Sequence, residues 1–280
     1  MARTREHVST HELGLSAEQK KKVLGNHGIY LLKHNTDFDE NTKIYRYMRL
    51  SSLLDMLYYS KMYVSNMQSF TDIRDRLGLM RLSKDILRFT YVQNFKDRQG
   101  EKNTRRALQL CASCWTLDKQ RDGDNRENFL MWKAYAGNEL GCRIGTTLGN
   151  LIESIESKQY DILISDMVYG NGSFNSEYES LIFRKTVHYE CEQEIRLVVL
   201  SNSPTGVYLN INLNKLFDCH NCECEITISP FVSLQTVYSI RNMVQEKCKK
   251  YEKLIVKQSD LLEFSISDES EEQHLLNRYK

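Results

Sequence analysis

The chain has 280 residues, of which 41% are hydrophobic and 27% are charged, and its 38 basic residues nearly balance 37 acidic ones. This near-neutral balance excludes the global basic surplus that is typical of nucleic-acid-binding proteins, and there is no acidic tail. No apolar run approaches the roughly 20 residues that span a bilayer, and the first residues lack the apolar centre of a signal peptide. We therefore expect a cytoplasmic protein that does not bind membranes.

The first part of the chain changes from a polar segment to tightly patterned elements. Residues 1–40 are charged, and the capping-box spacing of Ser16 and Gln19 predicts a short helix there. Its lysines form a solvated helix face or, as the less favoured alternative, contact a regulatory partner protein or nucleic acid. The pattern then predicts, in order, a strand over 44–48, a helix over 51–59 capped by Ser51 or Ser52, a strand over 61–65, a loop over 66–75 and an amphipathic helix over 77–107.

The second part is richer in predicted strands. In order, the pattern predicts a strand over 108–116, a polar loop over 118–126, a helix over 129–136 capped by Asp124 or Asn125, a strand over 141–147, a helix over 148–157, strands near 160–169, 187–200, 206–213 and 223–229, and a helix around 233–250. This order predicts one α+β domain over 41–265, with a mixed, largely antiparallel sheet flanked by helices. Residues 1–40 precede it as a polar, partly helical segment, and 266–280 follow as a polar tail.

The segment from Lys185 to Val199 combines charge with strand pattern. If it is a strand throughout, Glu190, Glu192, Glu194 and Arg196 project from one face, because side chains alternate along a strand. Carboxylates at this spacing lie roughly 7 Å apart and repel each other unless solvent, a cation or a substrate relieves them. This face is therefore a candidate site, and a solvated edge face is the alternative.

The eight cysteines suggest at most a weak metal site. The weak zinc candidates lie close together in the chain and have ligand-type side chains: Cys219, His220, Cys222 and Cys224. The CxxC pair of Cys111 and Cys114 lies in a segment that reads as a buried strand, where cysteine behaves as a small hydrophobe. Without an export signal, disulfides are not expected.

The order of short motifs resembles bacterial domain-of-unknown-function family 2971 over roughly residues 43 to 245. The motifs that carry the resemblance are YRY at 45–47, KMYVS at 61–65, FTD at 70–72, CWT at 114–116, MWKAYA at 131–136, GCRIG at 141–145, Lys185 and YECEQEIR at 189–196. Thr71, Ile73 and Arg74 depart from the family's FNDPFE loop, and three glutamates precede the arginine where the family has two. The family label names no activity.

The same order of elements also resembles the ADP-ribosyltransferase fold, and this resemblance implies a mechanism. It implies that Arg46, on the first strand, binds the phosphates or ribose of NAD, which is the substrate. It further implies that Glu194 faces the ribosyl cation and Glu192 the acceptor, with Glu192 and Glu190 as the alternative register. A guanidinium binds a diphosphate bidentately, and a preorganised carboxylate stabilises a developing oxocarbenium ion.

Other residues are candidates for supporting roles in NAD binding, and each also has an ordinary structural explanation. Trp132 and Tyr135 are expected on one helical face, where they stack on a ring of NAD or pack in the core. Asp72 orients Arg46 or caps a turn, and Ser65 contacts the ribose. Arg196 neutralises the glutamates or forms a structural ion pair.

Three functions from different classes remain open. The leading one is an NAD-consuming ADP-ribosyltransferase acting on a protein or nucleic acid, or an NAD glycohydrolase, and such enzymes are often toxins or antiphage-defence effectors. The second is a metal-dependent nuclease or phosphohydrolase in which Glu190, Glu192, Glu194 and Asp72 hold Mg²⁺. The third is a non-catalytic sensor or adaptor that binds protein or nucleic acid through residues 1–40 and the aromatic helix predicted over 129–136. P-loop and Rossmann glycine motifs are absent from the sequence.

Overall fold

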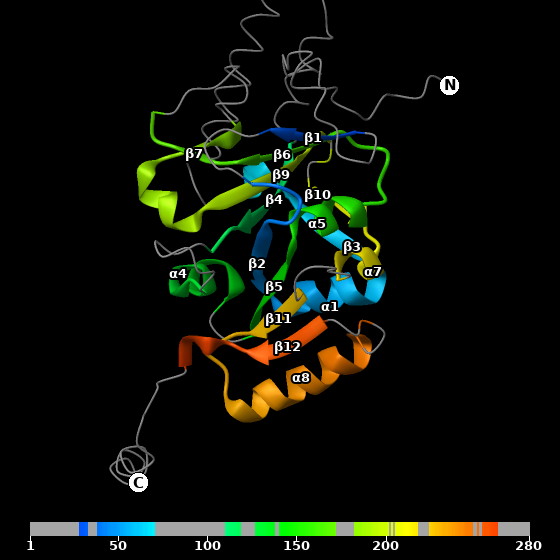
Figure 1. Ribbon diagram of the computed structural model, residues 1–280, viewed down its shortest axis with the longest axis vertical. Coiled ribbons are helices and arrows are strands. Elements are labelled where there is room, and N and C mark those ends of the chain that lie inside the picture. The colour runs from blue at the N-terminus through cyan, green and yellow to red at the C-terminus, as the bar shows by residue number, and fades with distance from the viewer. Residues whose placement is uncertain are drawn as a thin grey trace, which may run out of the picture.

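One large sheet forms the centre of the protein, and helices lie along its faces and edges (Figure 1). The computed structural model describes residues 28–32, 38–70, 110–118, 127–137, 140–171, 182–201, 203, 205–217, 224–248, 251 and 254–262. Within these residues, no helix is both long and apolar enough to cross a membrane.

The strands and helices alternate irregularly along the chain. The strands are β1 (Ile29–Leu32), β2 (Lys43–Arg49), β3 (Lys61–Asn66), β4 (Cys111–Thr116), β5 (Gly141–Thr147), β6 (Ile162–Asp166), β7 (Val168–Tyr169), β8 (Arg184–Lys185), β9 (Glu194–Val199), β10 (Gly206–Asn210), β11 (Cys224–Ile228) and β12 (Leu254–Gln258). The helices are α1 (Leu50–Tyr59), α4 (Phe129–Met131), α5 (Leu148–Ser154), α7 (Leu213–Leu216) and α8 (Leu234–Cys248). Shorter turns of helix are η3 (Met67–Ser69), η4 (Trp132–Ala136), η5 (Val187–Glu192) and η6 (Asp260–Leu262).

Ten of the described strands form one sheet in the order β1-β6-β9-β4-β2-β5-β11-β12, with β3 joined to β4 and β10 joined to β3, and β7 and β8 form a separate parallel pair. The pairs at the two ends, β1 with β6 and β11 with β12, are parallel, and the pairs between them are antiparallel. The prediction of an α+β fold with a mixed, largely antiparallel sheet is therefore confirmed.

The sheet splits at one edge of β4. The other edge pairs with β9 along its whole length, from Cys111 to Thr116. On the split edge, β3 pairs only with the first two residues, whereas β2 pairs only with Thr116 at the far end. Helix α1 follows β2 directly and leads into β3 after one left-handed residue, Ser60. Helix α1 returns the chain so that β3 runs in the same direction as β2. The two strands diverge, and an opening is left between them beside the middle of β4.

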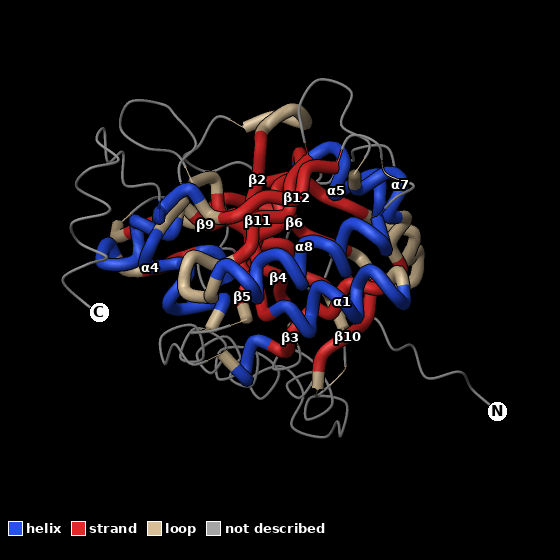
Figure 2. The backbone as a smooth tube through the Cα atoms, turned by 90° about the horizontal axis from the view of Figure 1, so that it is seen from below, coloured by secondary structure: helices blue, strands red, loops and turns tan. Residues whose placement is uncertain are grey.

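Apolar residues pack on both faces of the sheet. Leu53 and Met56 of α1 are buried in the larger core, together with apolar residues of β2, β4, β5, β9 and β11. Helix α8 packs against β12, β11 and α1, and Figure 2 shows α1 and α8 running across the same face of the sheet. A smaller core, which includes Met67, Phe183 and Val198, covers the opposite face around β4, β6 and β9.

A buried polar network joins β2, β5 and β11 to the start of α4. Tyr47 donates a hydrogen bond to Asp118 at 2.7 Å, and Arg143 pairs with Asp118 at 2.9 Å and with Glu225 at 2.5 Å. The Tyr47 hydroxyl also accepts the backbone N–H of Asn128 at 2.9 Å. A buried arginine is tolerated because carboxylates and aromatic rings surround it, so this network orients the segment that leads into α4.

Several local predictions differ from the structure. Arg49, not a serine, occupies the N-cap position of α1, and its side chain makes no capping hydrogen bond; Asn128 caps α4, with its side chain accepting two backbone N–H groups. Strands β1 and β12 are not predicted, and β1 extends the sheet into the segment that the sequence assigns to a separate N-terminal region. The helices expected near residue 16 and over 77–107, and the tail over 266–280, lie outside the described residues.

Gly206 is the glycine whose replacement we expect to cost most in this sheet. Its φ is +119°, and a Cβ there would lie 2.5 Å from the Tyr63 hydroxyl and 2.7 Å from the Val64 carbonyl oxygen. We expect Gly206→Ala to lower the free energy of unfolding by about 1–3 kcal/mol in urea titrations. Gly170→Ala is the control, because Gly170 also has a positive φ but no atom of the described residues within 4 Å of the added carbon. Equal losses in the two variants would contradict the steric explanation.

Candidate functional site

Two glutamates, a lysine and an arginine form a buried ionic cluster at the start of β9. Lys185 Nζ lies 2.5 Å from Glu192 Oε2 and 2.7 Å from Glu194 Oε2. Arg196 donates to both oxygens of Glu194, from Nε at 2.6 Å and from NH2 at 3.2 Å. Tyr135 donates to the other oxygen of Glu192 at 2.8 Å. The cluster is therefore neutral as a whole, with two cations and two carboxylates.

The backbone before β9 brings these side chains together in a way that the sequence does not predict. Residues from Val187 to Glu192 form the 3₁₀ turn η5, Gln193 is left-handed with a φ of 42°, and the strand begins only at Glu194. The prediction of one strand face is therefore wrong for Glu190 and Glu192. Glu190 is exposed on the turn, whereas Glu192 and Glu194 both reach Lys185. A single left-handed residue resets the direction of the chain between them.

The charges of the cluster shift one another's pKa values. Burial would raise the pKa of Glu194, but Arg196 and Lys185 outweigh burial and hold it well below its ordinary value. Burial would lower the pKa of Lys185, and the carboxylates of Glu194 and Glu192 raise it above its ordinary value instead. Cys114, opposite Arg196 on β4, has a raised pKa because of burial and the nearby Glu194. Its thiol is therefore a poor nucleophile.

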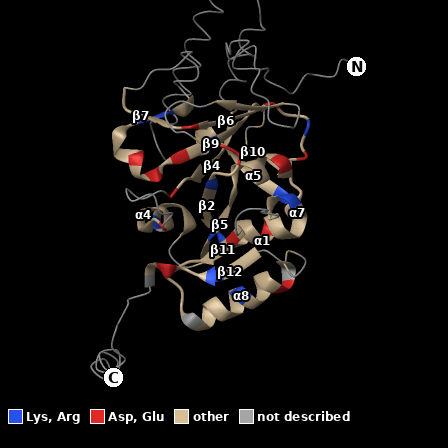
Figure 3. Cartoon of the chain, viewed as in Figure 1, with Lys and Arg blue, Asp and Glu red and all other residues tan. Residues whose placement is uncertain are grey.

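A cavity of about 680 Å³ lies at the split in the sheet, and Lys185 and Tyr135 belong to its lining. Its described lining comes from β2, α1, β3, the segment after β3, β4, η4, β8 and β10. Among the described lining residues, four are basic, namely Arg46, Arg49, Lys61 and Lys185, and one is acidic, Asp55. Its aromatic lining residues are Tyr47, Tyr63, Phe70, Tyr135 and Tyr208. Figure 3 shows that most positions on the central strands carry neither a basic nor an acidic residue.

Arg46 holds a position at which it can bind an anion. It projects from β2 near Trp115 and donates from NH2 to the backbone oxygen of Tyr63 at 3.3 Å, across the split between β2 and β3. No carboxylate of the described residues forms an ion pair with it, and burial lowers its pKa. A partly desolvated guanidinium without a carboxylate partner gains most by binding an anionic ligand.

The structure separates the other predicted site residues. Ser65 and Tyr135 line the cavity, whereas Trp132 is fully buried. The Trp132 ring packs edge-on against Tyr47, with 5.0 Å between the ring centroids, and its indole N–H donates a hydrogen bond to the Glu127 carboxylate. The expectation that Trp132 and Tyr135 share a face is wrong, because residues 132–136 form a π-type turn, which is wider than an α-helical turn. Asp72 lies outside the described residues.

The cysteine cluster gives no metal site in the part of the chain that the structure describes. Cys219, His220 and Cys222 lie outside that part. Cys224 is buried and disulfide-bonded, contrary to the expectation of reduced cysteines, so its sulfur is not available as a zinc thiolate. Over the described ranges, no group of three or more His, Cys, Asp or Glu side chains is placed to hold a metal ion.

Sequence reasoning missed several residues of the cavity. The sequence indicates Lys185 only as part of a motif and predicts no role for it, although it is the cation that joins the two glutamates. Arg49, at the end of β2, gives no sequence signal. Lys61 and Tyr63 do give one, because with Ser65 they alternate along β3 and share the face opposite Met62 and Val64.

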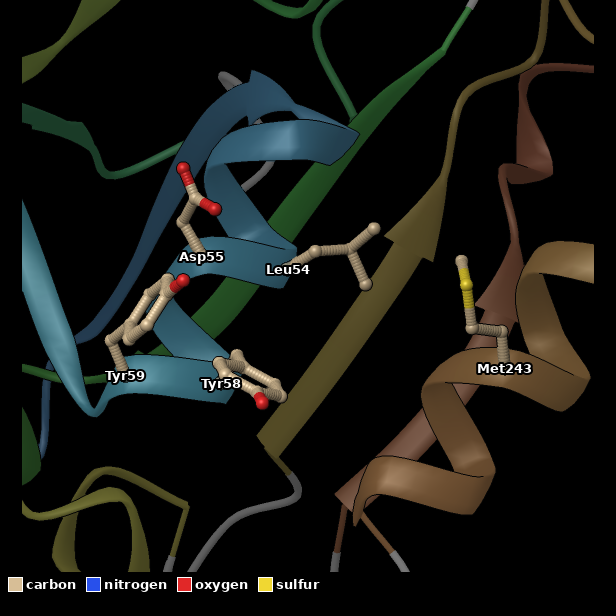
Figure 4. Close-up of a pocket in the computed structure, with 5 residues that line it drawn as sticks. All are labelled: Leu54, Asp55, Tyr58, Tyr59 and Met243. Carbon is tan, nitrogen blue, oxygen red and sulfur yellow. The ribbon is translucent and has the colours of Figure 1, made fainter.

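A second, smaller cavity lies away from the cluster, between α1 and α8. It has a volume of about 330 Å³ and is lined by Leu54, Asp55, Tyr58, Tyr59 and Met243. Figure 4 shows Met243 reaching from α8 toward the side chains of α1. With one carboxylate and no basic residue in its described lining, this cavity does not offer the charges of the larger one.

We expect Lys185→Met to destabilise the fold strongly, because it leaves two buried carboxylates with one arginine. Removing one partner of a buried ionic cluster costs about 3–5 kcal/mol, measurable by urea unfolding. Lys257→Met is the control: Lys257 also contacts two carboxylates, at 3.3 and 3.2 Å, but its side chain is 35% exposed. We expect that change to cost less than about 1 kcal/mol. If both variants lost a similarly small amount of unfolding free energy, the ionic cluster would be as well solvated as a surface ion pair, and the prediction would be wrong.

The depressed pKa of Glu194 makes its contribution to stability dependent on pH. A carboxyl with a lower pKa in the folded than in the unfolded state stabilises the fold fully above about pH 4.3, and the contribution is lost as the pH falls further. We therefore expect the stability difference between the wild type and Glu194→Gln to be largest near neutral pH and to shrink in acid. Urea titrations from pH 7 to pH 3.5 measure this; a difference independent of pH would contradict it.

Comparisons with known proteins leave the family of the chain open. No protein-family model matches the sequence, and no curated protein matches it.

Proposed function

We propose that this protein consumes NAD, transferring ADP-ribose to a macromolecule or hydrolysing the nicotinamide bond, and that the cavity at the split in the sheet binds the dinucleotide. The observation that carries the proposal is the composition of this cavity: Arg46 lines it together with Lys185 and Tyr135, the two side chains that contact Glu192. A guanidinium that has no carboxylate partner among the described residues suits the diphosphate, and a carboxylate held by fixed donors suits the reacting ribose.

The geometry favours Glu192 over Glu194 as the carboxylate that faces the ribose. The side chain of Glu192 is 10% exposed and that of Glu194 is 3% exposed. Both oxygens of each carboxylate have partners, but those of Glu192 are Lys185 and Tyr135, which line the cavity, whereas Arg196, which holds Glu194, is not among the lining residues. In this proposal the glycosidic bond between the ribose and nicotinamide breaks, and the electron pair leaves with nicotinamide. Glu192 stabilises the ribosyl cation, and water or an acceptor then attacks it and loses a proton to solvent. Glu194 and Arg196 position Lys185 and Glu192.

The other parts of the proposal follow by analogy with ADP-ribosyltransferases and carry less structural support. The acceptor is a protein or a nucleic acid, the protein is a cytoplasmic toxin or antiphage-defence effector, and residues 1–40 are where a regulatory partner would bind. The metal-dependent nuclease is not favoured by any contact in the described residues, because both Glu192 and Glu194 are paired with Lys185. The adaptor is not favoured either, because Glu192 and Glu194, unlike the exposed Glu190, are buried next to Lys185, which lines the cavity.

Release of nicotinamide from NAD by the purified protein, alone and with cell lysate, tests the proposal. We expect Glu192→Gln to lower the rate at least about a hundredfold, as removal of an electrostatic stabiliser commonly does. We expect Arg46→Lys to lower it about tenfold, because lysine keeps the charge but loses the bidentate geometry.

Two surface substitutions on α8 are the matched controls. Glu246→Gln and Arg241→Lys make the same chemical changes at exposed positions, and we expect wild-type rates from both. Circular dichroism and urea unfolding establish that Glu192→Gln and Arg46→Lys remain folded. No NAD consumption by the wild type, with or without lysate, would refute the proposal, and metal-dependent nucleic-acid cleavage would be the next assay.

A further inference from the structure

Two large aromatic side chains are left exposed at the outer wall of the cavity. Tyr63 on β3 is directly opposite Tyr208 on β10, and their ring centroids are 5.0 Å apart with a 51° tilt. Tyr63 is 40% exposed and Tyr208 is 58% exposed, and both line the cavity. Because exposed aromatic surface gains free energy when a flat apolar group covers it, the pair is a candidate for stacking on a ligand.

The Tyr63 ring is held in place before any ligand arrives. Its hydroxyl donates a hydrogen bond to the backbone oxygen of Thr205, and the ring end lies so close to Gly206 that no Cβ fits there. Tyr208 packs against this fixed ring and leaves more than half of its own surface open. A fixed ring loses little conformational entropy when a ligand stacks on it.

Cations lie next to the tyrosine pair. Lys61 is two residues before Tyr63 on the same face of β3, and Arg46 donates to the Tyr63 backbone oxygen at 3.3 Å. Arg49 lines the same cavity. Flat aromatic surface beside several cations matches a ligand with both a ring and negative charge, and stacking with phosphate contacts is how proteins commonly bind nucleotides.

We propose that Tyr63 and Tyr208 stack on the base of a nucleoside diphosphate whose phosphates are bound by Arg46, Arg49 and Lys61. This inference rests on the proposed function and deepens it, since it assigns the base to the β3–β10 end of the cavity. The reacting ribose then lies toward Lys185 and Tyr135, the lining residues that contact Glu192.

Binding of ADP and of inorganic pyrophosphate, measured by titration calorimetry on the full chain, tests the assignment. We expect Tyr208→Ala to weaken ADP binding about tenfold and to leave pyrophosphate binding unchanged, because pyrophosphate has no base to stack. Tyr208→Phe keeps the ring, so its ADP affinity stays within about twofold of wild type. Tyr238→Ala is the control, since Tyr238 is 62% exposed on α8 but lies outside the cavity lining, and we expect wild-type affinity.

Three outcomes would overturn the assignment: wild-type ADP affinity in Tyr208→Ala, an equal loss for ADP and pyrophosphate, or no binding of ADP to the wild type. Its failure is separable from that of NAD consumption. ADP binding that depends on Tyr208 without any nicotinamide release supports the base site and refutes only the enzymatic activity. Nicotinamide release with ADP affinity that is insensitive to Tyr208 refutes only the base site.

Discussion

Strand β4 and its unequal pairing impose the constraint on which the rest of the site depends. One edge of β4 is fully paired with β9, whereas β3 and β2 occupy only the opposite ends of the other edge. The short connection through α1 makes β2 and β3 run in the same direction without hydrogen-bonding to each other, so the sheet opens where a closed sheet would have no room for a ligand. Arg46 reaches across this opening to the backbone of β3, which explains how a strand arginine comes to line a cavity.

The ionic cluster at β9 offsets the electrostatic repulsion between two buried carboxylates. Two carboxylates close together in a medium of low polarity repel each other and lose hydration, and neither would remain ionised alone. Lys185 between them and Arg196 on the far side of Glu194 restore neutrality. The same arrangement gives the two carboxylates different environments: Glu194 is enclosed by cations, while Glu192 stays nearer to solvent and to Tyr135. Burial thus distinguishes residues that look equivalent in the sequence.

The cavity joins two regions with different chemistry. Toward β9 its lining includes Lys185 and Tyr135, which both contact the Glu192 carboxylate, and toward β10 it includes exposed aromatic rings with cations beside them. The first region offers a cation and a phenol, and the second offers flat aromatic surface next to positive charge.

The sequence by itself determined the parts that depend on local pattern: the strands β2, β3, β4 and β5, the helix between β2 and β3, and the α+β class with a largely antiparallel sheet. It also identified Arg46, Ser65 and Tyr135, which line one cavity. Only the tertiary structure decided the rest. Strands β1 and β12 are short edge strands, and their place depends on partners far away in the chain, β6 and β11. The turn at Gln193 moved Glu190 and Glu192 off the strand, and the role of Lys185 emerged only when folding brought it to both carboxylates. Periodicity reports the direction of side chains within one element, whereas a site depends on contacts between elements, and no local pattern encodes those.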